Sequence, residues 1–341
     1  MELNSTRYDF SDPFNLIAST IMVTNGIFGI ICNVLVSYVF FAVPAEQTSF
    51  NLMCVFRSIG NAIILFWGFG ATFIPILLKG SSPFSKIYET IVIISCNNLY
   101  VLVQFSGVMI AGNRFCAMFF PLTYAKVFNI KITSILLTVA FLFNQAEIGY
   151  CLVTIYRRSI LVSDSNTRLT KKICYITFSA LDCFTLFSSY YLAWVPNLNP
   201  NCHNQEDMPN PLNSTAILLG LLILMNIATF SKIYFFYKST ETEKETMKRK
   251  TRKNKVLFCQ TVFQDGIMLI DMLFTFKLSG LSDERYWTFI SGTLVWQSVH
   301  SIDGFVMVMF NERLTFLKRR LFGNLEESNR TNIQMMTSVH H

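Results

Sequence analysis

The sequence predicts an all-α protein, a seven-transmembrane helix bundle with a short amphipathic helix after the seventh span. Its 341 residues are 52% hydrophobic and only 14% charged, whereas soluble globular domains carry about 25% charged residues. Seven apolar stretches approach or exceed the roughly 20 residues that a helix needs to cross a bilayer. A mean hydropathy of +0.42 agrees with this interpretation.

The seven apolar stretches follow one another along the whole chain. The predicted spans cover residues 16–43, 50–78, 87–120, 132–156, 212–237, 256–278 and 286–310. The apolar segment 178–195 is not counted as an eighth span, because Asp182 and several serines interrupt it and prolines follow closely. Residues 314–322 combine basic with apolar side chains, which predicts a helix lying on the membrane surface.

The distribution of basic residues predicts the side of the membrane that each loop occupies. Lys and Arg are more numerous after spans three and five and in the tail, above all between residues 248 and 255. The positive-inside rule places these segments in the cytoplasm and the N-terminus outside. The predicted organisation is an extracellular segment 1–15, a membrane domain 16–322 and a disordered cytoplasmic tail 323–341. Asn4 begins a sequon and is a glycosylation candidate on the outer side.

Several classes of site are not indicated by the sequence. The nine cysteines show neither a CxxC pair nor the His/Cys spacing of a zinc site, and no nucleotide, cofactor or nucleophile motif is present. Asp265 and Asp271 lie six residues apart, so they do not share a helix face as a catalytic pair would. We therefore expect no metal, cofactor or enzymatic activity. The net charge of +7 clusters beside apolar spans, which favours the lipid bilayer over nucleic acid as a partner.

The end of the third span carries the most distinctive local pattern. Its apolar run holds no charge between Glu89 and Arg114, and Pro121 then ends the helix because proline lacks an N–H and clashes with the preceding turn. Arg114 either snorkels to the membrane surface or is delivered to one membrane face for contact with a partner. In span two, Arg57 is expected to reach the interface or to pair with an acid that the sequence does not identify.

One face of span seven combines aromatic and ionisable side chains. Trp296, His300 and Asp303 share this face, and the spacing lets His300 and Asp303 touch. The face either holds helices together through a satisfied polar pair or acts as a switch between a pocket and the cytoplasm.

A second polar face lies in the outer half of span three. Asn97, Tyr100 and Gln104 share it by the same spacing, with Cys96 beside them. These residues either line a pocket or form hydrogen bonds between helices, and the same two interpretations apply to Asp265 in span six.

Four motifs resemble those of a known receptor family. They are Ser-Phe at 49–50, Asn-Arg-Phe-Cys-Ala at 113–117, Phe-Pro-Leu-x-Tyr at 120–124 and His-x-x-Asp-Gly at 300–304. Together with the seven predicted spans, they resemble the nematode serpentine receptor class x group of chemoreceptors, within the rhodopsin-like G-protein-coupled receptors. The resemblance covers roughly residues 16–322.

The resemblance implies a chemosensory receptor of the plasma membrane that transmits the binding of an external small ligand to a heterotrimeric G protein. It assigns coupling to Asn113, Arg114, Phe115, Pro121, Leu122 and Tyr124. It assigns a polar switch within the membrane to Asn33, Asn61, His300 and Asp303. Across the bundle, Asp303 is expected to contact Asn61 and Asn33. The implied ligand pocket, in the outer halves of spans three, five, six and seven, has as candidates Cys96, Asn97, Tyr100, Gln104, Asp265 and Trp296.

Several positions depart from the wider rhodopsin-like pattern. Asn61 stands where that pattern has an aspartate and Asp303 where it has an asparagine, so acid and amide are exchanged between spans two and seven. Glu89 stands in place of the cysteine near the outer end of span three, so the usual disulfide to the second outer loop cannot form. The resemblance then leaves Cys174 and Cys202, both within that loop, as disulfide candidates. Span six also lacks the usual proline.

A transporter or a channel subunit without G-protein coupling is the alternative interpretation. A transporter would more often show internal repeats or discontinuous spans at matching positions, and the sequence shows no such pairing, although Pro75 interrupts span two. A channel subunit would need a pore helix lined with polar side chains, and the face of His300 is too sparse for that.

Overall fold

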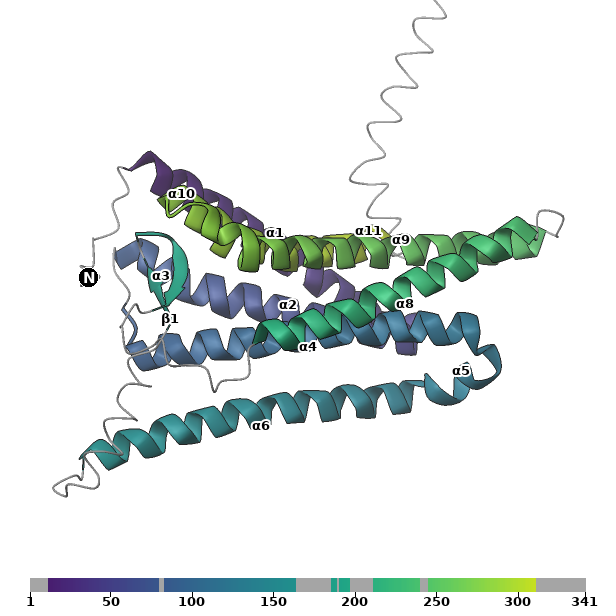
Figure 1. Cartoon of the computed structure of the whole chain (residues 1–341), viewed down its shortest axis with the longest axis horizontal. Helices are drawn as coiled ribbons and strands as arrows, with labels where there is room; N and C mark the ends of the chain where they lie inside the picture. The colour runs from purple at the N-terminus through teal and green to yellow at the C-terminus, as the bar shows by residue number, and fades with distance from the viewer. Residues whose placement is uncertain are drawn as a thin grey trace, which may run out of the picture.

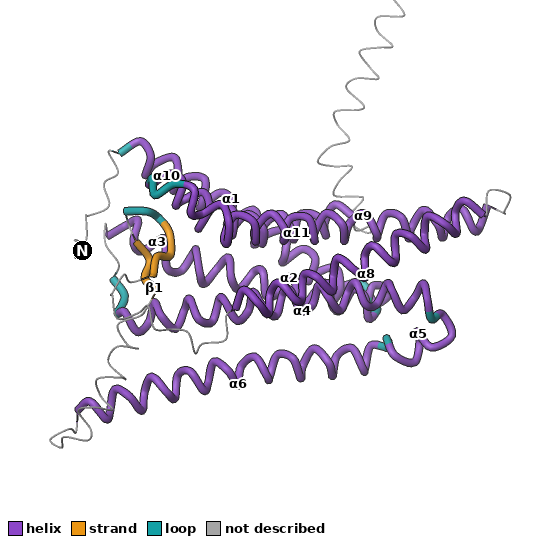
Figure 2. The backbone as a smooth tube through the Cα atoms, viewed as in Figure 1, coloured by secondary structure: helices purple, strands orange, loops and turns teal. Residues whose placement is uncertain are grey.

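The computed structural model describes residues 12–79, 83–163, 185–188, 190–196, 211–239 and 245–310. Within these ranges the helices make seven passes that lie side by side and alternate in direction (Figure 1). One end of the bundle carries a two-stranded β-hairpin, orange in Figure 2, and is called the hairpin end. The opposite end carries the short helix α5 and is called the α5 end (Figure 1). The predicted all-α bundle is confirmed, and the hairpin is an addition to it.

The elements follow the order of the predicted spans. The first four passes are α1 (Pro13–Ala42), α2 (Ser49–Ile63) continued by η2 (Ile64–Ala71) and α3 (Thr72–Lys79), α4 (Lys86–Phe119), and α6 (Ile130–Ser163). Short pieces connect them, namely η1 (Pro44–Glu46) and α5 (Pro121–Val127). The hairpin pairs β1 (Thr185–Ser188) antiparallel with β2 (Ala193–Pro196).

The last three passes complete the bundle. They are α8 (Pro211–Ser239), then α9 (Glu245–Leu273) with η4 (Phe274–Leu278) and η5 (Ser279–Leu281), and finally α10 (Arg285–Phe289), η6 (Ile290–Leu294) and α11 (Val295–Phe310). The stretches η2, η4 and η6 are π-helical. Such stretches are rare in proteins, and those that occur often lie near functional sites.

The passes differ in how well they meet the length and apolarity of a membrane span. In the described part of the chain four helices do so: Pro13–Ala42, Ser49–Ile76, Tyr88–Phe119 and Ala216–Phe235. The pair Pro121–Val127 and Ile130–Ala146, bent by 58°, is a fifth candidate. The sixth and seventh predicted spans are helical but do not qualify. In the sixth, side chains are described only from residue 259, so α9 offers fewer than 18 described residues, and in the seventh α11 alone has only 16 residues.

Local sequence explains where the helices begin. The Asp12 side chain accepts a hydrogen bond from the Phe14 N–H (2.9 Å), and Pro13 follows as the first helical residue, a favourable N-terminal sequence. Pro121 ends α4 as predicted, because it cannot continue the hydrogen-bond ladder. It is also the first residue of α5, so the Pro-Leu segment that follows the span is a short helix and not a loop.

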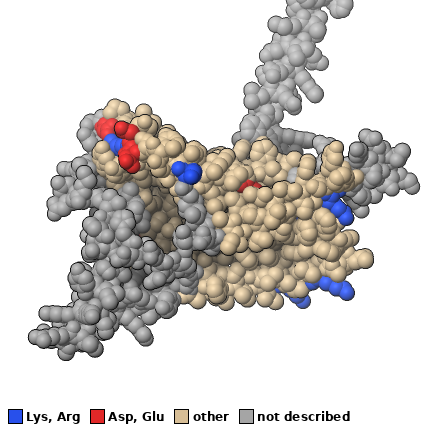
Figure 3. Space-filling model, in the orientation of Figure 1, with Lys and Arg blue, Asp and Glu red and all other residues tan. Residues whose placement is uncertain are grey.

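Two apolar clusters fill the bundle, one toward each end. The cluster toward the hairpin end includes Met22 and Phe69, and the cluster toward the α5 end includes Val36 and Met53. Along α2 and α11, buried polar residues lie between the two clusters. The outward side chains are apolar, such as Phe143, which is 76% exposed. In Figure 3, uncharged residues cover most of the described surface between the two ends. This distribution suits a bundle surrounded by lipid.

Candidate functional site

The buried polar layer is centred on Asp303 in α11. Its carboxylate accepts two hydrogen bonds from the Arg57 guanidinium, from Nε to Oδ2 and from Nη2 to Oδ1, each 2.8 Å long. Asn61 donates to Oδ2 at 2.6 Å and Gln264 donates to Oδ1 at 2.8 Å. Arg57 is 2% exposed and Asp303 is 1% exposed. A bidentate pair with further donors is the arrangement that compensates best for burying two charges.

His300, one turn before Asp303, extends this network toward the hairpin end. Its Nδ1 lies 2.7 Å from the Asn61 Oδ1. Because the Asp303 carboxylate only accepts, the Asn61 amide must direct its NH₂ toward Asp303 and its oxygen toward His300. His300 Nδ1 therefore carries a hydrogen, and its Nε2 is an acceptor. That Nε2 is buried without a hydrogen bond among the described residues.

Asn33 joins α1 to α11 through the backbone. Its Nδ2 donates to the Gly29 carbonyl at 2.8 Å and to the His300 carbonyl at 3.1 Å. A Cβ at Gly304 would lie 2.5 Å from this Nδ2, so glycine is required there. The structure therefore brings Asn61 to Asp303 as expected. The expectation for Asn33 is corrected, because its donor is used on backbone carbonyls.

Arg57 is the member of the network that the sequence left without a partner. It lies one turn before Asn61 on α2, and so on the same helix face. That spacing is a usable signal, because the expected Asn61–Asp303 contact already brings the carboxylate to this face. Gly107 on α4 provides room for the guanidinium, since a Cβ there would lie 2.8 Å from Arg57 Nη1. Gln264 also belongs to the network, and the sequence marked it only as a polar neighbour of Asp265 in span six.

Arg114 lies at the α5 end and differs from Arg57 in its surroundings. Its guanidinium carbon lies 5.0 Å from the centre of the Phe50 ring. All three of its side-chain nitrogens are buried, and none has a hydrogen-bond partner among the residues that the structure describes. Asn113 does not pair with it. The Asn113 Oδ1 accepts instead from the Tyr124 hydroxyl at 3.4 Å, which ties α5 to α4.

The other predicted coupling residues lie at the end of α4 and in α5. Phe115 stacks on Phe119 with ring centres 4.5 Å apart. Pro121 is exposed, and Leu122 is 92% exposed at the start of α5. Ser49 donates to the Phe128 carbonyl at 2.8 Å, which fixes the end of α5 against α2. The α5 end thus carries both an exposed apolar side chain, Leu122, and a buried cation, Arg114.

The predicted pocket residues do not form one group. The Tyr100 hydroxyl donates to Asp271 Oδ2 at 2.5 Å, and Asp271 is an acid that was not among the pocket candidates. Gln104 is buried near Tyr100 on the same face. Asn97 is exposed, so its place in the pocket was wrong: on α4 this side chain points out of the bundle.

The remaining pocket candidates are engaged elsewhere. Cys96 is buried against η2, where a Cβ on Gly68 would lie 2.9 Å from its sulfur. Trp296 packs on Phe69 with ring centres 5.1 Å apart, beside the hairpin-end cluster. Asp265 accepts a hydrogen bond from Asn226 of α8. These contacts correspond to the packing and interhelical interpretations of these residues.

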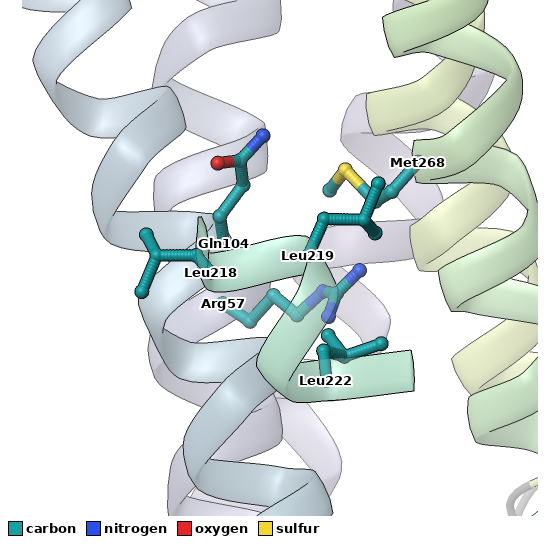
Figure 4. Close-up of a pocket in the computed structure, with 6 residues that line it drawn as sticks. All are labelled: Arg57, Gln104, Leu218, Leu219, Leu222 and Met268. Carbon is teal, nitrogen blue, oxygen red and sulfur yellow. The ribbon is translucent and has the colours of Figure 1, made fainter. Parts of the chain in front are cut away.

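A cavity lies between α2, α4, α8 and α9. Its empty volume is about 280 Å³, open solvent included. Figure 4 shows the six side chains that line it, Arg57, Gln104, Leu218, Leu219, Leu222 and Met268. The Gln104 amide points away from the Arg57 guanidinium in this view, so the two polar groups occupy different parts of the cavity wall.

The hairpin is attached to the bundle by hydrogen bonds. Glu89 accepts from the Phe187 N–H at 3.1 Å, at the position where a disulfide to this loop was judged impossible. Thr293 donates to the carbonyl of Leu192 at 2.8 Å, and Leu192 has a φ of 52° in the hairpin turn. Arg285 contacts Asp12 and the Tyr190 carbonyl. Residues 185–188 and 193–196 are therefore strands and not part of an eighth helix.

Some predicted features fall outside the described residues. They are the glycosylation candidate Asn4, the disulfide candidates Cys174 and Cys202, the amphipathic helix 314–322 and the tail 323–341. Among the described side chains, no group of three His, Cys, Asp or Glu is placed to hold a metal ion.

Comparison with known proteins places the chain in a receptor family. A family model described as the serpentine type 7TM GPCR chemoreceptor Srx matches residues 23–159 and 161–311. The chain belongs to this family. Serpentine receptor class X 45 of Caenorhabditis elegans is 20% identical over 321 residues, which cover 89% of this chain and 81% of that protein. Both the Asp303 network and Arg114 lie within the matched residues, so they belong to a multi-pass membrane receptor of the chemoreceptor type.

Proposed function

We propose that this chemoreceptor resides in the plasma membrane and passes the binding of an external small molecule to a heterotrimeric G protein at its α5 end. The observation that carries the proposal is the state of Arg114. A buried guanidinium without hydrogen bonds is costly, because donors removed from water need acceptors. Its five N–H groups form a rigid fork that suits carboxylates and backbone carbonyls. An intracellular partner that inserts such groups at the α5 end would satisfy it.

The Asp303 network supplies a path between the two ends. His300 and Asn61 connect its hairpin-end side to the Arg57–Asp303 pair, and Gln264 brings in α9. A ligand can shift the receptor only by its difference in affinity between two arrangements of the helices. We expect the active arrangement to alter the Gln264–Asp303 bond, because α9 runs from the α5 end to this network.

The orientation in the membrane is part of the proposal. We place the α5 end and the C-terminal tail in the cytoplasm and the hairpin end outside, as the positive-inside rule predicts. Lys126 and Lys131 on either side of the α5–α6 junction support this choice. Epitope tags at the two termini test it. Intact cells should bind antibody at the N-terminus only, and binding at the C-terminus would reject the orientation.

A cell-based assay tests the coupling. Cells that express the receptor and a G-protein activation sensor are screened with a panel of volatile and water-soluble organic compounds. Responses should appear for at least one compound and fall at least tenfold in Arg114→Ala at equal surface expression. Lys79→Ala, which removes an exposed charge at the hairpin end, should respond as the wild type does. Compound-dependent uptake or current without G-protein activation would instead indicate a transporter or channel.

A further inference from the structure

Asp271 is a buried acid in the hairpin-end half of α9. It is 2% exposed. Its Oδ2 accepts from Tyr100, and its Oδ1 has no hydrogen bond among the described residues. No ion pair between described residues involves Asp271, since Arg57 pairs with Asp303 and Arg285 with Asp12. An unpaired acid within a membrane bundle is costly and marks a functional site by default.

Two further unsatisfied acceptors lie beside the Tyr100–Asp271 pair. The ring of His300 meets the Tyr100 ring edge-on, with centres 5.9 Å apart. His300 Nε2 is the free acceptor that the Asn61 contact leaves. Gln104 lies one turn from Tyr100 on α4, and its Oε1 is also buried without a partner among the described residues. Asp271 Oδ1, Gln104 Oε1 and His300 Nε2 are thus three buried acceptors without a hydrogen bond among the described residues, on side chains that adjoin Tyr100.

Aromatic rings border this cluster. They are the ring of Tyr100 and the ring of Trp296, whose centre lies 6.1 Å from that of His300. Both pack against the hairpin-end apolar cluster, which also contains Phe187 of the hairpin. Aromatic faces attract cations by about 0.5–2 kcal/mol each, the larger values applying where water is excluded.

The cavity described above adjoins the cluster. Gln104 belongs to both, and Met268, which lines the cavity, lies three residues before Asp271 on the same face of α9. The wall contributed by α8 is apolar, formed by Leu218, Leu219 and Leu222. In the view of Figure 4, Gln104 directs its amide away from the Arg57 guanidinium. A molecule with its polar head at Asp271 would therefore have its apolar part against the leucines of α8.

We propose that Asp271 is the counter-ion of a protonated primary amine, and that this receptor recognises small lipophilic amines. An ammonium group has three donors and no acceptor, which matches Asp271 Oδ1, Gln104 Oε1 and His300 Nε2. A carboxylate ligand would be repelled by Asp271. An alcohol donates one hydrogen and leaves the acid without a cation. Because the 280 Å³ of this cavity includes open solvent, its enclosed space is well below the roughly 300–1,000 Å³ of known ligand sites, so the amine must be small.

This inference rests on the proposed function when it is tested through G-protein signalling. The primary test therefore measures amine binding, which does not require coupling. Purified receptor in lipid nanodiscs is titrated with aliphatic and aromatic primary amines, and with the alcohol and carboxylic acid of the same skeletons. The melting temperature reports occupancy, because a ligand that binds only the folded state raises it. Amines should raise it, and their matched alcohols and acids should not.

Three variants locate the site. Asp271→Asn keeps the shape of the side chain and removes its charge, so the apparent amine affinity should fall at least about 30-fold, as for loss of one member of a buried charge pair. Without ligand this variant should melt at the same temperature or higher, since a buried unpaired charge is gone. Tyr100→Phe should also weaken amine binding, and Asp283→Asn, an exposed acid lost from the surface, should not.

The outcomes separate this inference from the proposed function. Equal amine affinity in the wild type and Asp271→Asn, or a panel in which no amine raises the melting temperature, overturns the inference. Amine binding that depends on Asp271 but activates no G protein supports the inference and rejects the coupling. A G-protein response to a non-amine that survives Asp271→Asn supports the coupling and rejects the inference.

Discussion

Two arginines in this receptor are buried in opposite circumstances. Arg57 in α2 makes a bidentate pair with Asp303 and has Gly107 opposite it to provide space. Arg114 in α4 has a phenylalanine ring and no hydrogen-bond partner among the described residues. The residue type is the same and the nitrogens of both lie within the bundle. Only Arg57 has the counter-charge and hydrogen bonds that offset the desolvation of a buried cation.

The contrast separates structural from functional burial. The Arg57–Asp303 pair joins α2, α9 and α11 through Asn61 and Gln264, so it specifies how these helices meet. Arg114 makes no hydrogen bond to a described helix and contacts α2 only through the Phe50 ring, so we propose that its unsatisfied donors serve a molecule from outside the chain. A residue that destabilises the fold and has no compensating contact within the protein is often one retained for function. The same reasoning at the hairpin end distinguishes Asp271, which has no cation partner among the described residues, from Asp303.

The largest expected effect is that of removing the partner of Arg57. Asp303→Ala should lower the free energy of unfolding by about 3–5 kcal/mol, because it leaves a buried guanidinium without a counter-charge. The double variant Arg57→Met with Asp303→Leu should lose less than Asp303→Ala, since it leaves no charge behind. Unfolding of purified protein followed by intrinsic fluorescence measures both. A double variant less stable than Asp303→Ala would contradict this account of the pair.

A smaller effect is expected from the space around Arg57. Gly107→Ala places a Cβ 2.8 Å from Arg57 Nη1, and the guanidinium cannot retreat while Asp303 holds it. Overpacking of this kind costs about 1–3 kcal/mol. Gly112→Ala on the same helix is the matched control, because its nearest neighbour, Met225 Sδ, would lie 3.9 Å away. That control should be neutral or gain up to about 1 kcal/mol from helix propensity.

Both glycine variants are compared by thermal unfolding under one set of conditions. Equal melting temperatures for Gly107→Ala and Gly112→Ala would mean that Arg57 has freedom to move, and hence that its pairing with Asp303 is loose.

The helical passes could be predicted from the sequence because each depends on local composition. A long apolar run can only cross a bilayer as a helix, since its backbone groups must be satisfied internally. The hairpin was not predicted, because its stability comes from distant residues such as Glu89 and Thr293. The π-helical stretches η2, η4 and η6 likewise have no signature in hydropathy.

Those features of the candidate site that depend on residue spacing within one helix could be predicted from the sequence. The shared face of His300 and Asp303 follows from spacing on α11, and so does the position of Arg114 at the end of α4. The partner of Arg57 requires the relative rotation of α2 and α11, which no single segment contains. Asn97 shows the converse error. Its spacing from Tyr100 was correct, but the periodicity of one helix does not say which part of the face turns toward the bundle.

The smallest stability effect, and the one that most directly tests the contrast, comes from the same substitution at the two arginines. Arg114→Met should leave the melting temperature unchanged or raise it by a few degrees, since about 1 kcal/mol corresponds to 2–4 °C in a domain of 150–250 residues. The loss of the Phe50 ring contact, about 0.5–1 kcal/mol, partly offsets the gain from removing unsatisfied donors. Arg57→Met should instead destabilise clearly, because Asp303 is left charged and buried. A melting temperature that falls equally in both variants would mean that Arg114 is held by an internal partner, and its donors would then be unavailable to a G protein.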